Sequence, residues 1–446
     1  MPEKLAFGFG KEFEDFITRF SLEQGLIPDA SSLSSTRYLN RCILPHVQKL
    51  SQLFNRNSLD PKHEPKNQRS PLNAYWKETS NPEHLRAAYF LSFMPANLYR
   101  VASIWAELRR LGFQWSTDSV RAIELGAGPA SGACGIMAGE KFAPVGLPSS
   151  LSWALVEQDK NMLQLGASWL EAYTSYLGGP HSQSSIRTFH RKIDLKQGFL
   201  PRGAPQFHLW IMSYFLNESE FSPRELAAQL ITAWQHHLED EGVVILVEPA
   251  LKLQSRQLLE LRAEILLEAQ RRKLDWLKLL LPCLGHQNCG ALASPEDWCH
   301  EEVTWWRPPY FKAIDQKAGL DRKTLPFSYL VFIKTQRSRT EVLPALASPE
   351  LNPVRLVSPA YSQGQDLEFF LCGAEGKRRA RVHQKKLQAS TAEKDPALQK
   401  SSEGETPEPQ ATRKKEALLQ RGDILLDTEI RGDQNASRIE SLLRII

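Results

Sequence analysis

The spacing of apolar residues gives the first quarter of the chain a helical character. Apolar residues recur at helical spacing from Leu39 to Leu53. A second stripe of the same period runs from Leu91 to Leu111. We therefore expect residues 1–112 to form a helical N-terminal domain.

From about residue 119, short apolar runs alternate with helical segments. The runs expected to be strands are 121–125, 153–156, 208–212 and 243–247. The segments expected to be helices are 130–138, 159–174, 222–239 and 250–271. This alternation is typical of a parallel sheet with helices on both faces. It predicts an α/β, Rossmann-like domain over residues 113–279.

The alternation breaks after residue 279. Residues 280–310 crowd Cys, His, Pro, Gly and Trp together, and strands are expected again at 328–334, 354–357 and 367–371. We therefore expect residues 280–375 to form a Cys-rich metal-cluster segment with closing strands. Residues 376–386 contain six Lys/Arg and no acid, and 387–416 are poor in apolar residues. These features predict a basic, largely disordered tail over 376–446, with a short helix near 437–446.

Composition narrows the setting. The 446 residues carry a net charge of only +4, and no apolar run is long enough to span a bilayer. The first twenty residues include four acids, which is unlike a targeting segment, so we expect the cytoplasm. Six cysteines in a cytosolic chain indicate metal or redox chemistry and no disulfide partner.

One glycine loop carries candidate chemistry. Residues 121–132 read RAIELGAGPASG, so a strand runs into Gly126-Ala127-Gly128 and a helix follows. Glycines permit the tight turn and a close approach of ligand to backbone. Glu124, just before the loop, can bind a ligand ammonium directly or through water, and would repel a dinucleotide phosphate. The loop therefore favours an S-adenosylmethionine (SAM) site over a dinucleotide site, with an ordinary strand–helix turn as the alternative.

Polar residues also follow the other expected strands. Glu157 ends the second strand and can accept both ribose hydroxyls, or it is simply a solvated strand end. Asp194, in RKIDL, follows a further candidate strand, the third in chain order, between the runs 153–156 and 208–212, and can meet the adenine edge. Ser213 follows the fourth strand, where substrate and cofactor meet in this fold. With the glycine loop, these residues form the expected cofactor site.

Four cysteines gather in the second half of the chain: Cys283, Cys289, Cys299 and Cys372. Four thiolates can hold a [4Fe–4S] cluster or a structural Zn²⁺. Zinc ribbons usually use CxxC pairs, so the wide gaps here favour the cluster. His286 and His300 keep a mixed Cys/His zinc site open, and buried, unligated cysteine is the remaining alternative.

Together these segments resemble the small-ribosomal-subunit methyltransferase-like family, the bacterial relatives of mitochondrial methyltransferase-like protein seventeen. The resemblance covers roughly residues 35–375 and rests on AAYFLSFMPANLYRV, IELGAGPASG, IMSYFLNE, VILVEPA, LPCLGH…NC…DWCH and LPFSYLVFIK. It implies a class I methyltransferase fold in which Glu124, Gly126, Gly128 and Glu157 line a SAM site. It also implies a [4Fe–4S] cluster on the four cysteines and association with the small ribosomal subunit and its rRNA.

Two functions remain open at this point. The first is a methyltransferase acting on small-subunit rRNA, and the second is an inactive assembly factor that keeps the cofactor pocket, with structural Zn²⁺ instead of iron and sulfide. No Pro-Pro-Tyr run follows the fourth strand, where Ser213-Tyr214-Phe215 stands, so no catalytic residue is assigned. RNA contact is expected from basic side chains against phosphate, with a solvated tail as the alternative: Lys377, Arg378, Arg379, Arg381, Lys385 and Lys386.

Overall fold

The chain folds into two compact units. A computed structural model describes residues 9–56, 79–140, 148, 150–178, 184–193, 198–201, 203–216, 221–285, 289–348, 352–383, 419–427, 430–433, 436–439 and 442–444. Unit 1 comprises Met1–Leu281 and Trp298–Leu343, and unit 2 comprises Pro282–Asp297 and Pro344–Ile446. The chain therefore leaves unit 1 after Leu281, returns at Trp298 and leaves again after Leu343.

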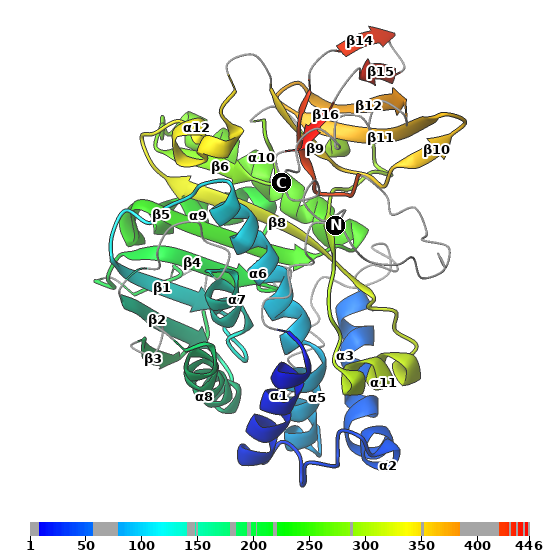
Figure 1. Ribbon diagram of the computed structural model, residues 1–446. Coiled ribbons are helices and arrows are strands. Elements are labelled where there is room, and N and C mark those ends of the chain that lie inside the picture. Colours follow the sequence, from blue (N-terminus) through cyan, green and yellow to red (C-terminus); the bar gives the residue numbers. More distant parts are fainter. Residues whose placement is uncertain are drawn as a thin grey trace, which may run out of the picture. The chain divides into compact units, whose positions relative to one another are not determined.

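A twisted, mostly parallel sheet forms the centre of unit 1 (Figure 1). Its strands are β1 (Ser119–Leu125), β2 (Ser150–Glu157), β3 (Ser185–His190), β4 (Phe207–Ser213), β5 (Leu238–Pro249), β6 (Leu277–Leu281), β7 (Glu301–Thr304) and β8 (Thr324–Lys334). Their order is β3-β2-β1-β4-β5-β8-β6, with β7 on the edge of β8. Strands β1 to β5 pair in parallel, and β8 runs antiparallel to β5, β6 and β7. The order reverses between β1 and β4, where ligands bind in sheets of this type.

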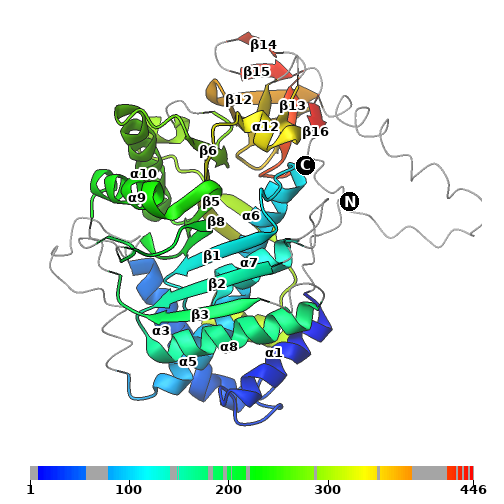
Figure 2. The same ribbon diagram turned by 90° about the vertical axis from the view of Figure 1, so that its left-hand side faces the viewer.

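Helices cover both faces of this sheet. The helices of unit 1 are α1 (Lys11–Glu23), α2 (Thr36–Tyr38), η1 (Leu39–Ile43), α3 (Leu44–Arg56), α5 (Pro82–Ser92), α6 (Met94–Arg110), α7 (Ser131–Gly139), α8 (Lys160–Leu177), α9 (Pro223–His237), α10 (Lys252–Arg271), α11 (Pro309–Ala318) and α12 (Arg339–Val342). Helices α6, α7 and α8 pack together on one face, and α9 lies beside α10 on the other (Figure 2). Because both faces are covered, the central strands contain continuous apolar runs, and Val243 to Val247 are all buried.

The strands and helices predicted between residues 121 and 271 are confirmed, within a few residues at each end. Helix α7 shows why small residues fill this part of the chain. A Cβ added at Gly135 would lie 2.8 Å from the carbonyl oxygen of Leu98, and one added at Gly139 would lie 2.8 Å from that of Ala102. Glycines therefore let α7 pack closely against α6.

The described residues before 112 are mostly helical, as expected, but they do not form a domain of their own. Phe13, Phe16 and Phe20 of α1 pack on Trp169 of α8, with ring centroids 6.4, 5.0 and 4.9 Å apart respectively. Aromatic pairs at such distances bury large apolar areas. This contact joins the N-terminal helix to the domain that carries the large sheet.

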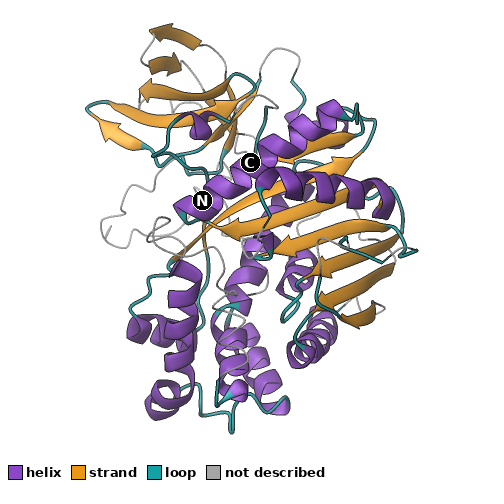
Figure 3. Cartoon of the chain, turned by 180° about the vertical axis from the view of Figure 1, so that it is seen from behind, coloured by secondary structure: helices purple, strands orange, loops and turns teal. Residues whose placement is uncertain are grey.

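Strands dominate unit 2 (Figure 3). Its elements are η6 (Gly290–Ala293), η7 (Pro344–Leu346), β9 (Pro353–Leu356), β10 (Tyr361–Gln363), β11 (Asp366–Gly373), β12 (Gly376–His383), β13 (Ile424–Asp427), β14 (Ile430–Asp433), β15 (Ala436–Ile439) and β16 (Leu442–Arg444). The strand order is β14-β15-β12-β11-β9-β13-β16, with β10 on β11. Leu356, Phe369, Leu371 and Leu425 belong to its own buried core.

Three expectations for the second half of the chain need correction. Strand β8 belongs to the large sheet, so residues 280–375 are not a single segment. Residues 376–383 form strand β12, although we expected a disordered tail from 376. Strands β15 and β16 occupy part of the stretch 437–446 where a helix was expected.

Candidate functional site

The glycine loop connects β1 to α7 at the carboxyl edge of the large sheet. Gly126 has φ +67° and Gly128 has φ +50°, a region that favours glycine. A Cβ added at Gly126 would lie 2.7 Å from Cδ2 of Phe215, so no larger residue fits there. Around Gly128, by contrast, nothing lies within 4 Å of an added Cβ. The loop is thus tightly held at its first glycine and open at its second.

Glu124 supports this loop from inside. The residue is 1 % exposed, and its carboxylate accepts hydrogen bonds of 2.9 Å from the backbone N–H groups of Gly132 and Ala133. These groups belong to the first turn of α7, whose N–H groups have no partner within the helix. Burial raises the pKa of Glu124 to about 8. Both of its oxygens thus contact α7, and the expected binding of a ligand ammonium, directly or through water, stays a prediction.

Glu157 joins the end of β2 to the same loop. Its Oε2 accepts a hydrogen bond of 3.0 Å from the N–H of Gly128, and its Oε1 accepts bonds of 2.8 and 3.0 Å from the N–H groups of Gln158 and Asp159. The Ala127 N–H also donates to the Val156 carbonyl at 3.0 Å. Burial is the main cause that raises the pKa of Glu157. The carboxylate therefore lies at the open part of the loop.

The end of β4 completes this edge. Tyr214 has φ +58°, which is strained for a residue with a side chain, and its N–H donates to the Val247 carbonyl at 2.7 Å. The hydroxyls of Ser213 and Tyr214 are buried, and neither has a hydrogen-bond partner among the described residues. At the end of β5, Glu248 accepts a bond of 2.8 Å from the Leu216 N–H. Polar groups thus gather where the strand order reverses.

The structure brings most of the predicted cofactor residues together. Glu124, Gly126, Ala127, Gly128, Glu157 and Ser213 lie at the carboxyl ends of the neighbouring strands β1, β2 and β4. Asp194 lies outside the described residues. We did not predict roles for Glu248 or Phe215. Glu248, the acid in VILVEPA, lies near the end of β5 as Glu157 lies at the end of β2, so the sequence pattern that indicated Glu157 could also have indicated Glu248.

Three of the four clustered cysteines belong to unit 2 and flank one hairpin turn. Cys372 pairs with Lys377 across the β11–β12 hairpin. Gly285, two residues after Cys283, lies so close to the turn that an added Cβ would be 2.7 Å from the Gly373 carbonyl oxygen. Gly290, next to Cys289, would place a Cβ 2.6 Å from that of Lys377. Small residues therefore bring the backbone beside both cysteines against the strand pair that carries the third.

Cys299 belongs to unit 1, where its carbonyl accepts a bond of 3.0 Å from the Ser328 hydroxyl. All six cysteines lie within the described residues, and none forms a disulfide. Within those residues, no group of three or more His, Cys, Asp or Glu side chains is arranged to hold a metal ion. Within unit 2, the backbone beside Cys283, Cys289 and Cys372 thus comes together around one hairpin.

The order of the large sheet, with antiparallel β8 between β5 and β6, is that of class I SAM-dependent methyltransferases. A family model described as mitochondrial small ribosomal subunit Rsm22 matches residues 84–405, which is more than half of the chain. The chain belongs to the Rsm22 family. The match includes the glycine loop, the end of β4 and all four clustered cysteines.

Solved structures with a similar fold include methyltransferases. The plantazolicin methyltransferase BpumL, in complex with SAH, is 11% identical, covers 65% of this chain and 99% of its own, and has a TM-score of 0.33. Precorrin-6y C5,15-methyltransferase from Geobacter metallireducens is 13% identical over 52% of this chain and 86% of its own, with a TM-score of 0.29. Aeropyrum pernix fibrillarin with bound SAM is 12% identical over 53% and 76%, with a TM-score of 0.26. These scores are low, so the fold assignment rests on the strand order and the family match. No curated protein matches significantly.

The basic run of this Rsm22-family chain is a paired strand. Arg379 and Arg381 of β12 both contact the carboxylate of Glu368 on β11, and Lys377 pairs with Asp297. Lys385 and Lys386 lie outside the described residues. We expected a run without acids, but neighbouring segments supply the acids, so part of this positive charge is neutralised.

Among the helices of the described residues, none combines the length and apolar character of a membrane span. The cytoplasmic location stays a prediction.

Proposed function

We propose that this Rsm22-family chain binds SAM at the carboxyl edge of its large sheet and acts on the small ribosomal subunit as an rRNA methyltransferase. The observation that carries the proposal is the contact between Glu157 and the Gly128 N–H, 3.0 Å long, at the open part of the glycine loop. A carboxylate in this place can accept the ribose hydroxyls, while Gly128 leaves room for close approach of the ligand. When bound, SAM supplies the methyl group.

The protein's contribution to methyl transfer is placement. Proximity and orientation can supply about 7–11 kcal/mol of a reaction barrier. Glu124 holds the first turn of α7 and so fixes the loop, and the strained Tyr214 fixes the end of β4 beside it. The target is proposed to be rRNA because the family is named for the small ribosomal subunit. Basic side chains that include Arg378 are proposed to contact its phosphates.

We further propose that Cys283, Cys289, Cys299 and Cys372 hold a [4Fe–4S] cluster. Thiolates are the ligands that such clusters require, and the close approaches of Gly285 and Gly290 to the β11–β12 hairpin support the proposal. Metal and sulfide analysis of anaerobically purified protein tests it. Cys289→Ser is expected to lose iron, sulfide and brown colour, whereas Cys42→Ser keeps them. A colourless wild-type protein containing one zinc ion would replace iron with zinc.

The test of the cofactor site is calorimetric titration with S-adenosylhomocysteine (SAH). Glu157→Ala is expected to weaken binding at least tenfold, because hydrogen bonds to a charged group contribute about 1.5–3 kcal/mol. Glu239→Ala is the matched control, since this acid begins β5 at the opposite edge of the same sheet. Failure of the wild-type protein to bind SAH would reject the site.

A second function is an assembly factor that binds SAM without transferring a methyl group. Two features favour this second function. Ser213-Tyr214-Phe215 stands after β4, where many nucleic-acid N-methyltransferases have a Pro-Pro-Tyr run. The ring of Phe215 also lies against Gly126 and so covers part of the glycine loop. Methyl incorporation into small subunits isolated from a strain lacking the protein separates the two functions. Labelled rRNA supports the enzyme, and SAH binding without labelled rRNA supports the assembly factor.

A further inference from the structure

Arg100 of α6 is a positively charged side chain without an anionic partner among the described residues. Its Nη1 donates a bond of 2.7 Å to Oδ1 of Asn97, and its Cζ lies 5.7 Å from the centre of the Tyr214 ring. The Arg100 Nε is buried and has no hydrogen-bond partner within the described residues. No carboxylate in that part of the chain forms an ion pair with it. A partly buried guanidinium without an anion is costly, so an anionic partner is expected.

Arg322 provides the contrast. Its Nε donates to Oδ1 of Asp315 at 2.8 Å, and it also bonds to the Ser92 hydroxyl at 2.9 Å. Arg322 therefore has its anion inside the fold. Arg100, whose positive charge acts on Arg322, has no such anion among the described residues.

The position of Arg100 relates it to the proposed cofactor site. Tyr214 follows β4 directly, and the next residue, Phe215, contacts Gly126 of the glycine loop. The helix turn that carries Arg100 packs on α7, where a Cβ added at Gly135 would lie 2.6 Å from that of Val101. The backbone that carries Arg100 therefore lies against the helix that follows the loop, and the guanidinium itself lies at the Tyr214 ring, directly after β4.

The charges at this edge explain why a cation is needed there. Glu157 and Glu248 lie at the ends of β2 and β5. Their carboxylates would repel an anionic group, and Glu248 and Arg100 are the two charges that act in opposite directions on Tyr214. SAM and SAH carry an α-carboxylate on the amino-acid tail. A planar guanidinium matches a carboxylate with two parallel hydrogen bonds.

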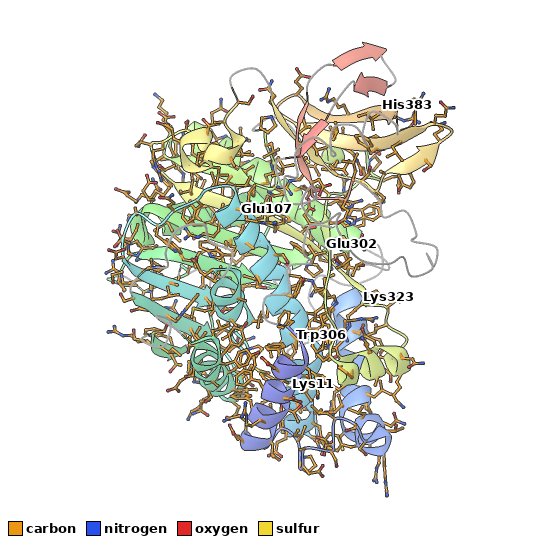
Figure 4. The ribbon with its side chains drawn as sticks, in the orientation of Figure 1. Lys11, Glu107, Glu302, Trp306, Lys323 and His383 are labelled. Atoms are coloured by element: carbon orange, nitrogen blue, oxygen red, sulfur yellow. The ribbon has the colours of Figure 1, made fainter. Side chains whose placement is uncertain are left out.

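We propose that Arg100, oriented by Asn97 and by the face of Tyr214, binds the α-carboxylate of the cofactor's amino-acid tail. This inference rests on the proposed SAM site. It makes Arg100 a residue that selects cofactors with an intact amino-acid tail. Glu107 lies further along α6, towards its C-terminus (Figure 4). Its carboxylate has a different partner, since it accepts a hydrogen bond of 3.2 Å from the Tyr329 hydroxyl.

The experiment compares two ligands that differ only in the carboxylate. Calorimetry measures the affinities of SAH and of decarboxylated SAH, which keeps the adenosine, the thioether and the amine. The wild-type protein is expected to prefer SAH by about tenfold to a hundredfold, the range for hydrogen bonds between charged groups. In Arg100→Gln this preference is expected to fall to near unity, with binding of decarboxylated SAH retained, and Arg100→Lys is expected to recover part of it. Arg110→Gln, exposed on the same helix, is the control and keeps the full preference.

Each outcome decides a different point. Equal weakening of both ligands in Arg100→Gln would mean that Arg100 only supports the fold, and an unchanged preference would mean that another group binds the carboxylate. Either result overturns the inference and leaves the SAM site standing. Loss of RNA binding with SAH binding intact would assign Arg100 to a substrate phosphate and also overturn it. If the wild-type protein binds neither ligand, the SAM site and the inference both fail.

Discussion

Replacement of Gly132 by alanine tests whether Glu124 holds the glycine loop. Gly132 lies in the first turn of α7, and a Cβ added there would be 2.5 Å from Oε1 of Glu124 and 2.8 Å from Cγ2 of Ile211. Real Cβ atoms essentially never approach other atoms this closely. The carboxylate that accepts the Gly132 and Ala133 N–H groups must therefore move.

Opposing effects decide the size of the change. Alanine favours a helix over glycine by about 1 kcal/mol. Overpacking a filled core costs about 1–3 kcal/mol, and a hydrogen bond to an uncharged group contributes about 0.5–1.5 kcal/mol, the range that applies because burial raises the pKa of Glu124 to about 8. With one of the two bonds to Glu124 lost, we expect Gly132→Ala to lower the free energy of unfolding by about 1–3 kcal/mol.

Urea unfolding followed by tryptophan fluorescence measures this change in unit 1 alone. All 11 tryptophans fall within the residue ranges of that unit. In a Glu124→Ala background, the methyl group introduced by Gly132→Ala no longer clashes with the Glu124 carboxylate. The loss in free energy of unfolding caused by Gly132→Ala should therefore be smaller by at least about 1 kcal/mol. If Gly132→Ala is neutral or stabilising, or if its penalty is the same in both backgrounds, Glu124 does not hold the loop as described.

Three further predictions follow from single contacts. Because burial raises the pKa of Glu157, the affinity of the protein for SAH should fall as the pH drops through that raised pKa. Calorimetry at several pH values measures this fall, which should be absent in Glu157→Gln. Glu368→Gln frees Arg379 and Arg381, so RNA affinity and its salt dependence should rise in filter binding, whereas Glu302→Gln should change neither. Phe20→Ala should destabilise unit 1 by about 3–5 kcal/mol in urea unfolding, and a loss below about 1 kcal/mol would mean that α1 is not part of the core.

Local patterns were sufficient to predict the strands and helices around the glycine loop. Runs such as Val243 to Val247 are continuous and apolar because the sheet is covered on both faces, and such runs stand out in a sequence. The positions of Gly126 and Gly128 likewise follow from the backbone they require. The sequence could not reveal that α7 turns its first N–H groups onto Glu124, because that contact depends on how the helix leaves the loop.

Long-range partners account for the other differences. The phenylalanines of α1 form a visible apolar stripe, yet nothing local identifies Trp169 as their partner. In β12, Ala380 and Val382 alternate with arginines as they should in a strand, but the basic residues hid this period. The acid that neutralises Arg379 and Arg381 lies on the preceding strand. Nothing in the sequence marked Arg100 as a candidate binding residue, because the absence of a neighbouring anion among the described residues is visible only in the structure.

The double passage of the chain between its units sets an order for folding during synthesis. Unit 1 has all of its residues once Leu343 is made, and domains generally fold as their sequence emerges. Residues 282–297 must wait longer, because their unit is finished only near the C-terminus. Arg355 shows this dependence, since its guanidinium donates to the Pro282 carbonyl at 2.9 Å and to the Gly422 carbonyl at 3.1 Å. A ribosome that stops before Gly422 would therefore release a finished methyltransferase-like domain with an unfinished companion.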